Sequence, residues 1–311
     1  MLQMFGFLGS ILGYLLWGLF YIFKNFGVSI IFFTLIIRLI LFPFSIKQQK
    51  SMANTARLQK KQKEIKEKYA NNRQKQNEEM QKLYQQEGVS PTGGCLTSLV
   101  PMLIMLGIFY SVTAPLSNTL HIDKTVIANA MGSFNAIPGF SVADTAIFGN
   151  SATYQEFSFV RALADAQPVI AQIFPAGDAA NVEMLVNGFN FLGLNFLSTP
   201  QGEGFGSIYI IIPILCFASS VVAQLVTMRI NKQQQRGCMM FMMIGLPLFS
   251  AWISFQVPVA VGFYWICSSL FSMVQSIIMG KLYGPDALIA RSEAQHIALL
   301  ELQEAQIKPV K

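Results

Sequence analysis

Five stretches of almost uninterrupted hydrophobic residues divide the chain, and polar segments of very different lengths separate them. A helix needs roughly 20 apolar residues to cross the hydrocarbon core of a bilayer. Each of the five stretches meets this length, so we predict membrane spans at residues 25–46, 94–115, 207–228, 238–256 and 257–279. The pattern therefore predicts an all-α polytopic membrane protein with five transmembrane helices.

The composition agrees with this assignment. Hydrophobic residues make up 53% of the 311 residues and charged residues 12%, whereas a soluble domain carries about 25% charged residues. A soluble enzyme is therefore nearly excluded. The four cysteines and two histidines show no metal-ligand spacing, and no catalytic Ser/His, paired-Asp or HExxH pattern occurs. We therefore expect no metal, no cofactor and no enzymatic activity.

The charges between the spans predict the orientation. Residues 47–93 hold eleven Lys/Arg and five Asp/Glu, the loop 229–237 holds three basic residues and no acid, and residues 116–206 hold two basic and seven acidic residues. By the positive-inside rule, the first two segments are cytoplasmic and the third lies outside. The N-terminus is then outside and the tail 280–311 is cytoplasmic. Topology thus explains the net charge of +6 without a specific nucleic-acid partner.

Residues 1–24 allow two interpretations. They are apolar and long enough for a sixth span, but small or polar side chains recur every three or four residues, including Ser10, Gly13 and Trp17. Such a stripe is the polar face of an amphipathic helix. We favour a helix lying in the outer membrane interface. Because no positively charged segment precedes the apolar residues, a cleaved signal peptide is disfavoured.

The segment 47–93 predicts a helical hairpin in the cytoplasm. Lys, Gln and Glu dominate residues 47–87, which contain no Pro or Gly, and Asn71–Asn72 interrupt the middle. Two helices that fold back on each other fit this pattern. The hairpin is either a solvated loop or a basic element that meets clients, lipid head groups or the ribosome. Its candidate contact residues are Lys60, Lys61, Lys63, Lys66 and Lys68.

Arg38 is the only charged residue within the hydrophobic runs of the five predicted spans. An arginine near the centre of a span costs about 2.5–3.5 kcal/mol on insertion scales, so it is expected to face a polar cavity. Snorkelling toward the cytoplasmic face is the alternative. With no Asp or Glu in any span, the cavity would be hydrated and net positive, unlike a carboxylate proton relay. Candidate polar neighbours on other spans are Ser219, Ser220, Gln224, Thr227, Trp265, Ser268, Ser269 and Gln275.

Several segments together resemble the YidC family of membrane protein insertases. They are NFGVSIIFFTLIIRLILFPFSIKQQKS (25–51), KLYQQEGVSPTGGCLTSLVPMLIMLGIFYSV (82–112), FLGLNFLSTP (191–200), IYIIIPILCFASSVVAQ (208–224) and VPVAVGFYWICSSLFSMVQSIIM (257–279). The resemblance is to the short form, without the large N-terminal domain of Gram-negative members. One departure is the long insert 116–190, for which we expect a small helical cap, with 152–173 as one helix. This cap is either lineage-specific or partner-binding.

The resemblance implies a hydrophilic groove that is open to the cytoplasm and the lipid and closed outside. Arg38, Gln224, Trp265 and Ser268 would line it, and Arg38 would attract the acidic translocated tail of a client membrane protein. The implied function is insertion and folding of membrane proteins in the bacterial plasma membrane. The Sec translocon and the ribosome are further candidate partners, beside membrane lipids.

Two other classes of function stay open. A positively charged intramembrane cavity would also suit a small-solute transporter or anion channel, although the chain shows no inverted repeat of the kind common in transporters. A purely structural scaffold, with the hairpin as its docking site, is the other alternative. Solute flux would support the first, and loss of client binding without loss of insertion on deletion of residues 47–87 would support the second.

Overall fold

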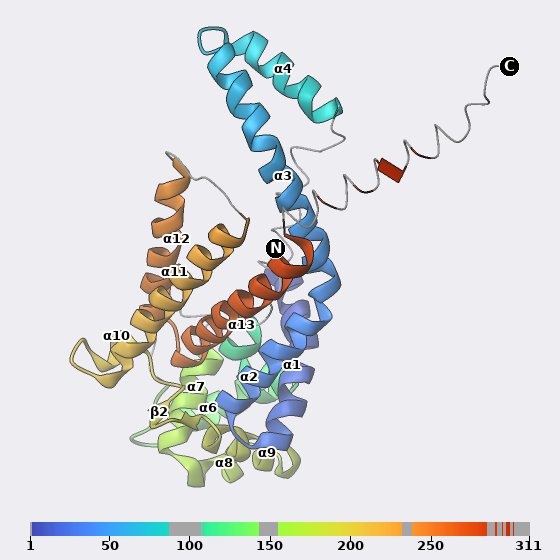
Figure 1. Ribbon diagram of the computed structural model, residues 1–311. Coiled ribbons are helices and arrows are strands. Elements are labelled where there is room, and N and C mark those ends of the chain that lie inside the picture. Colours follow the sequence, from blue (N-terminus) through green and yellow to red (C-terminus); the bar gives the residue numbers. More distant parts are fainter. Residues whose placement is uncertain are drawn as a thin grey trace, which may run out of the picture. The chain divides into compact units, whose positions relative to one another are not determined.

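The structure is a computed structural model that describes residues 2–86, 107, 109–142, 155–231, 238–284 and the single positions 290, 294, 297, 298 and 301 (Figure 1). The chain forms two compact units, which we describe separately. The first unit comprises Met1–Leu39, Val100–Val222 and Gly237–Phe271. The second unit comprises Ile40–Leu99, Ala223–Arg236 and Ser272–Lys311.

The long apolar helices lie where the hydrophobic runs predict membrane spans. They are α2 (Phe26–Ile40), α11 (Ile211–Asn231) with the short η3 (Ile208–Ile210) before it, α12 (Cys238–Gln256) and α13 (Val259–Tyr283). Within the described residues, Ile208–Ile230 and Val259–Tyr283 are each long and apolar enough to cross a membrane, and α2 with the start of the next helix gives a third, broken candidate. This confirms an all-α polytopic membrane protein. Most of the predicted span 94–115 lies outside the described residues, so the count of five stays a prediction.

The first predicted span, residues 25–46, is interrupted. Helix α2 ends at Ile40, and α3 (Phe42–Lys68) begins at Phe42 with Pro43 in its first turn. Proline lacks a backbone N–H and disfavours the helical conformation in the residue before it. It is therefore well tolerated in the first turn of a helix, as here, but not in a helix interior. The end of the predicted span and the first helix of the predicted hairpin are therefore one continuous element.

The second unit contains the helical hairpin of α3 and α4 (Arg73–Gln86) (Figure 1). The helices are separated at Tyr69–Asn72, where the sequence predicted an interruption. The side chain of Asn72 accepts a hydrogen bond from the backbone N–H of Lys75 at 3.0 Å, which satisfies one of the free donors at the start of α4. The Gln76 side chain donates to the Lys66 carbonyl oxygen at 3.4 Å and links the two helices.

Residues between the second and third predicted spans form a mostly helical cap. Its elements are η1 (Pro115–Thr119), α6 (Lys124–Asn135), α7 (Gln155–Asp165), α8 (Gln167–Ile173), α9 (Ala176–Asn187), the strands β1 (Asn190–Phe191) and β2 (Leu194–Asn195), and α10 (Pro200–Glu203). The strands pair antiparallel, with Asn190 opposite Asn195 and Phe191 opposite Leu194. The prediction of one helix over 152–173 is wrong. The helix breaks at Ala166 because Pro168 lies in the first turn of α8.

Phenylalanine rings dominate the core of the first unit. Phe26 at the start of α2 packs on Phe20 of α1 (Leu2–Phe23) at 6.0 Å and on Phe189 after α9 at 4.4 Å between ring centroids. Within the cap, Phe134 meets Phe159 edge-on at 5.6 Å. Full burial of such a ring contributes about 1.5–3 kcal/mol. The shared aromatic core therefore joins α1 and α2 to the cap.

Helix α1 packs against η1 through small residues of its stripe, and its position in the outer interface stays a prediction. A Cβ on Gly13 would overlap the backbone carbonyl oxygen of Asn118 in η1, and the Ser10 hydroxyl lies 3.1 Å from His121 Nε2. Small side chains let two backbones approach closely, so Ser10 and Gly13 belong to a contact face. Large exposed side chains of α1 are Ile11, Tyr14, Ile22 and Tyr21, and the last of these belongs to the predicted stripe.

Glu156 joins α7 to η1. Its Oε2 accepts a hydrogen bond from the backbone N–H of Ser117 at 2.9 Å. Burial raises the pKa of Glu156 above its usual range, and the bonds to Ser117 offset only part of that effect. The folded protein therefore holds this proton to a higher pH than the unfolded chain does.

Replacement of Glu156 by glutamine is expected to stabilise the protein at neutral pH. With a raised pKa, the contribution of Glu156 to stability is complete below its ordinary pKa and is lost as the pH rises through the folded value. Glutamine can still accept from Ser117 but carries no charge to desolvate. We expect a gain in Tm of about 1–3 °C at pH 7 that disappears near pH 4. Thermal unfolding in detergent across this pH range measures it, and a pH-independent difference would contradict it.

Candidate functional site

The Arg38 side chain contacts α13. Its Nη2 donates to the carbonyl oxygen of Ser268 at 2.9 Å and to the Ser268 hydroxyl oxygen at 2.8 Å. Arg38 is half-buried. Two of the residues predicted for the groove are thus in direct contact, and the guanidinium is held between two apolar helices. This geometry disfavours snorkelling.

Tyr264 extends this contact, and the sequence did not single it out. It lies one helical turn before Ser268, is 7% exposed, and interacts with the Ser268 side chain and with the charge of Arg38. The spacing of four residues from Ser268 was the available signal, because such residues share a helix face. Trp265, which was predicted, is half-buried and packs against the hydrophobic core.

Hydroxyl groups pair between α11 and α13. In the first unit, the Ser220 and Ser269 hydroxyl oxygens lie 3.3 Å apart. In the second unit, the Thr227 hydroxyl donates to the Ser276 hydroxyl oxygen at 3.1 Å. Each pair spans the same separation of 49 positions along the chain. We call Gln224, Thr227 and Ser276, which all lie in the second unit, the polar seam.

Gln224 lies between the two hydroxyl residues of α11 on the same helix face. Its Oε1 is buried and accepts no hydrogen bond within the described part of the chain. A buried acceptor that lacks a partner lowers the stability of the fold by about 1–3 kcal/mol.

Ser219, another polar residue predicted on this helix, donates to the Cys216 carbonyl oxygen of its own helix at 3.2 Å.

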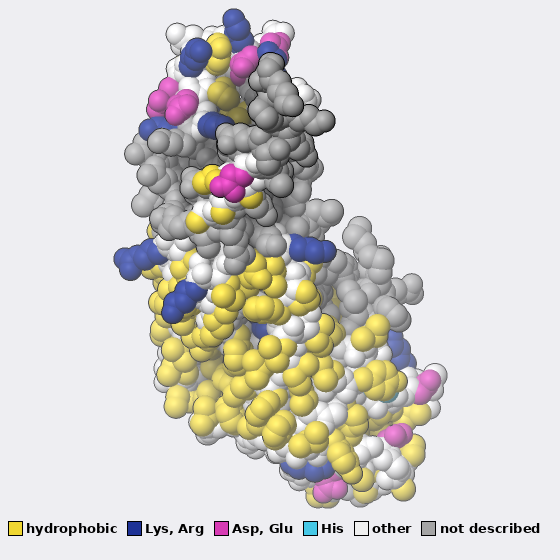
Figure 2. All heavy atoms as spheres, turned by 45° about the vertical axis from the view of Figure 1, so that its right-hand side comes forward, with side chains coloured by type: hydrophobic (Ala, Val, Ile, Leu, Met, Phe, Trp, Pro, Cys, Tyr) yellow, Lys and Arg dark blue, Asp and Glu magenta, His cyan; other side chains and the backbone are white. Residues whose placement is uncertain are grey.

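The predicted basic residues of the hairpin lie on α3. Lys61, Lys66 and Lys68 are exposed, and Lys63 pairs with Glu67 at 3.5 Å. The side chain of Lys60 lies outside the described residues. Exposed ion pairs of this kind contribute about 0–1 kcal/mol, so the pairing of Lys63 does not remove its charge from the surface. Figure 2 shows Lys, Arg, Asp and Glu side chains gathered over the described part of the hairpin.

Many exposed side chains of α11 and α12 are apolar, and Figure 2 shows a broad yellow area on the face of the molecule that it presents. Soluble proteins rarely expose large contiguous apolar patches, whereas a membrane-embedded helix must. Exposed side chains on these helices are Ile211, Ile214, Leu215, Leu246, Leu248, Phe249 and Trp252. We therefore interpret this surface as facing lipid.

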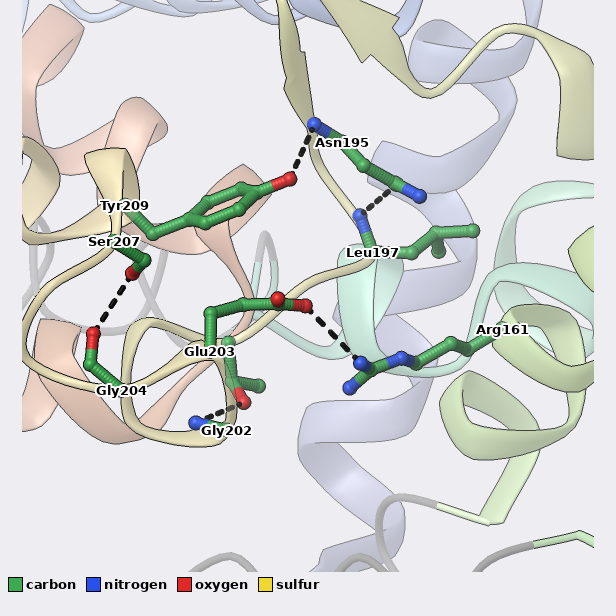
Figure 3. Close-up of polar contacts among 9 residues, drawn as sticks. Arg161, Asn195, Leu197, Gly202, Glu203, Gly204, Ser207 and Tyr209 are labelled. Atoms are coloured by element: carbon green, nitrogen blue, oxygen red, sulfur yellow. Dashed lines mark hydrogen bonds and ion pairs between the residues drawn. The ribbon is translucent and has the colours of Figure 1, made fainter.

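The β1–β2 hairpin covers the N-terminal turns of three helices. The Phe191 ring packs edge-on against Phe263 of α13 at 5.6 Å, and a Cβ on Gly27 of α2 would overlap the same ring. In Figure 3 the Asn195 backbone N–H donates to the hydroxyl of Tyr209, at the start of the third span, at 3.2 Å. The first turns of three helices thus contact one hairpin.

An ion pair fastens the cap near this hairpin. Nη2 of Arg161 in α7 lies 3.2 Å from Oε1 of Glu203 in α10 (Figure 3). The Thr199 hydroxyl accepts a hydrogen bond from the Gly202 backbone N–H at 3.2 Å and caps the start of α10. The ion pair was not predictable from the sequence, because Arg161 and Glu203 are 42 positions apart. Together these contacts tie the cap to the segment that enters α11.

Comparison with known proteins identifies the family. The family described as "60Kd inner membrane protein" matches residues 18–285. A membrane protein insertase YidC of Caldanaerobacter subterraneus subsp. tengcongensis is 27% identical over 254 residues, which are 82% of this chain and 84% of that protein. A membrane protein insertase YidC of Fusobacterium nucleatum is 45% identical over 85 residues, 27% of this chain and 42% of its own length. One from Nitratidesulfovibrio vulgaris is 39% identical over 98 residues, 32% of this chain and 17% of its own length. These matches confirm the resemblance seen in the sequence, and the chain belongs to the 60Kd inner membrane protein family.

Proposed function

We propose that this protein is a membrane protein insertase and chaperone, which acts alone or with the Sec translocon. The observation that carries the proposal is the Arg38 guanidinium, held by Ser268 between two apolar helices of a chain from this family. The alternative of a small-solute transporter or anion channel is not favoured, because the named relatives are insertases.

The contacts of Arg38 suit transient binding of an acidic client tail. Both oxygens that Arg38 meets on Ser268 belong to neutral groups, so they orient the guanidinium without cancelling its charge. At an effective dielectric constant of 20, a carboxylate 4 Å away is attracted by about 4 kcal/mol. That energy offsets part of the cost of bringing an acidic residue into the membrane.

The polar seam supplies hydrogen-bonding groups for the rest of the tail. Each unsatisfied backbone group costs several kcal/mol in hydrocarbon. The buried Oε1 of Gln224 can accept from a client N–H or from water, and the hydroxyl of Thr227 lies on the same face of α11. No covalent bond is made or broken in this process, so the protein lowers a barrier without enzymatic chemistry.

The remaining assignments complete the proposal. The protein would be a multi-pass protein of the bacterial plasma membrane, with the N-terminus outside and the C-terminal tail in the cytoplasm. The hydrophilic groove would open to the cytoplasm and the lipid. The hairpin lysines would meet clients, lipid head groups or the ribosome, and Phe191 in the β1–β2 hairpin would help to close the outer end.

Reconstitution in liposomes tests the function. A single-span client with an acidic N-terminal tail is presented to liposomes with and without the purified protein, and protection of the tail from added protease is measured. We expect protection several-fold above that of empty liposomes, since the groove removes a barrier of several kcal/mol. Protection equal to the empty control would exclude Sec-independent insertion, and solute flux through the same liposomes would favour the transporter alternative.

A further inference from the structure

The turn of the β1–β2 hairpin exposes a leucine in a conformation that leucine disfavours. Leu192 and Gly193 are its two central residues, with φ of 52° and 78°. Two-residue turns with positive φ at both positions favour Asn-Gly or Asp-Gly, and a bulky residue at positive φ is an outlier. The Leu192 side chain is nevertheless 80% exposed, so packing within the described residues does not explain the choice of leucine.

The position of this turn along the membrane helices is defined by its neighbours. Phe191, directly before Leu192, packs against Phe263 in the second turn of α13 and against Gly27 in the first turn of α2. Asn195 on the other strand bonds Tyr209 at the start of the third span. The exposed leucine therefore lies at the level of the first turns of these helices.

A second exposed apolar residue lies at the same helix end. Phe205 is 82% exposed between Gly204 and Gly206, three residues before the candidate span Ile208–Ile230 begins. Its ring stacks on Phe255 in the last turn of α12 at 4.9 Å. One turn earlier on α12, Trp252 is 53% exposed. Aromatic side chains are enriched where membrane helices meet water.

We propose that Leu192 and Phe205 insert into the interfacial layer of the lipid leaflet that surrounds the N-terminal ends of α11 and α13. The occupant is phospholipid, because Phe205 lies just before the exposed Ile208 and Ile211 of the span itself and Leu192 lies at the level of the first turns of the same helices. The Arg161–Glu203 ion pair connects the Phe205 turn to α7, so the two insertions hold the cap against the membrane surface.

This inference rests on α11 and α13 crossing a membrane and not on insertase activity. If the proposed insertase function fails in the protection assay, the lipid contact is still measured independently. Conversely, a protein that inserts clients but keeps both turns in water would contradict only the inference made here.

Depth-dependent quenching tests the proposal on the full chain in phosphatidylcholine–phosphatidylglycerol liposomes. Leu192→Cys and Phe205→Cys are made separately, with the native Cys95, Cys216, Cys238 and Cys267 replaced by alanine, and each carries an environment-sensitive fluorophore. Ile214→Cys on the exposed face of α11 is the lipid-facing control, and Lys124→Cys at the exposed start of α6 is the comparison site in the cap. Quenchers are aqueous iodide and phospholipid with a nitroxide near the head group.

Labels at Leu192 and Phe205 are expected to be quenched by the nitroxide lipid at least about two-fold more than the label at Lys124, and by iodide at most about half as much. Iodide quenching as strong as at Lys124, with no response to nitroxide lipid, would overturn the proposal. Protection from both quenchers would overturn it too, because it would indicate a protein partner or a second copy of the chain. The two sites are separate variants, so a folding defect in one leaves the other as a test.

Discussion

Replacement of Arg38 by alanine is expected to reduce insertion of a client with an acidic translocated tail about ten-fold or more. The guanidinium attracts a carboxylate by about 4 kcal/mol at close range, and each 1.4 kcal/mol corresponds to a factor of ten. Even partial loss of this attraction exceeds that factor. The rate of tail protection in liposomes measures the effect.

Three further variants separate charge from geometry at this site. Arg38→Lys keeps the positive charge but loses the planar guanidinium with its fixed set of N–H donors. We therefore expect an insertion rate between those of the unchanged protein and Arg38→Ala. Ser268→Ala removes one of the two oxygens that orient Arg38 and is expected to cost less than Arg38→Ala. Lys124→Ala removes an exposed positive charge from the cap and is the matched control. If Arg38→Ala reduced insertion of a client without acidic tail residues as much as insertion of the acidic client, the proposed role of the charge would be contradicted.

Replacement of Gly13 by leucine is expected to destabilise the protein by about 3 kcal/mol or more. A Cβ at this position would overlap the backbone carbonyl oxygen of Asn118, and a backbone atom cannot move aside as a flexible side chain can. Overpacking of a well-packed site costs about 1–3 kcal/mol and occasionally more. Since α1 carries Phe20 of the aromatic core, its displacement would also open that core. Thermal unfolding in detergent measures the loss.

Gly18→Leu on the same helix is the control for this prediction. Among the residues that the structure describes, and apart from the chain next to Gly18 itself, no heavy atom lies within 4 Å of a Cβ at this position. Both substitutions replace glycine by leucine in the same helix and so gain the same helix propensity, about 1 kcal/mol. The difference in stability between the two variants therefore reports the contact with Asn118 alone. Equal transition temperatures for the two variants would show that α1 does not depend on this close approach.

The features predictable from sequence are those that depend on local pattern. The fourth predicted span has the same bounds as α12, and the third and fifth differ from α11 and α13 by a few residues at their ends. In hydrocarbon, a helix satisfies the backbone hydrogen bonds of such an unbroken apolar run. Asn71–Asn72 marked the hairpin break because asparagine disfavours a helix interior. Arg38 was identifiable because charge in hydrocarbon is costly.

The features that escaped prediction depend on contacts between distant residues. Ser268 was one of eight polar candidates, and only the fold selects it as the partner of Arg38 across 230 positions. The stripe on α1 was interpreted as polar because a packing face made of glycine and serine has the same pattern as a water-facing one. The strands β1 and β2 have two residues each, which is too short for any alternation to appear.

The pairing of Arg38 with a serine has a consequence for the response to acidity. A serine hydroxyl and a backbone carbonyl oxygen neither gain nor lose a proton between about pH 4 and 9, which is roughly the interval between the ordinary pKa values of aspartate and lysine. The two bonds described for Nη2 therefore do not depend on pH, and the predicted spans contain no Asp or Glu that could compete for the guanidinium. We therefore expect the two bonds between Arg38 and Ser268 to add no pH dependence of their own to the insertion rate. A client whose tail carries several carboxyl groups then meets the same oriented arginine at every pH in this range.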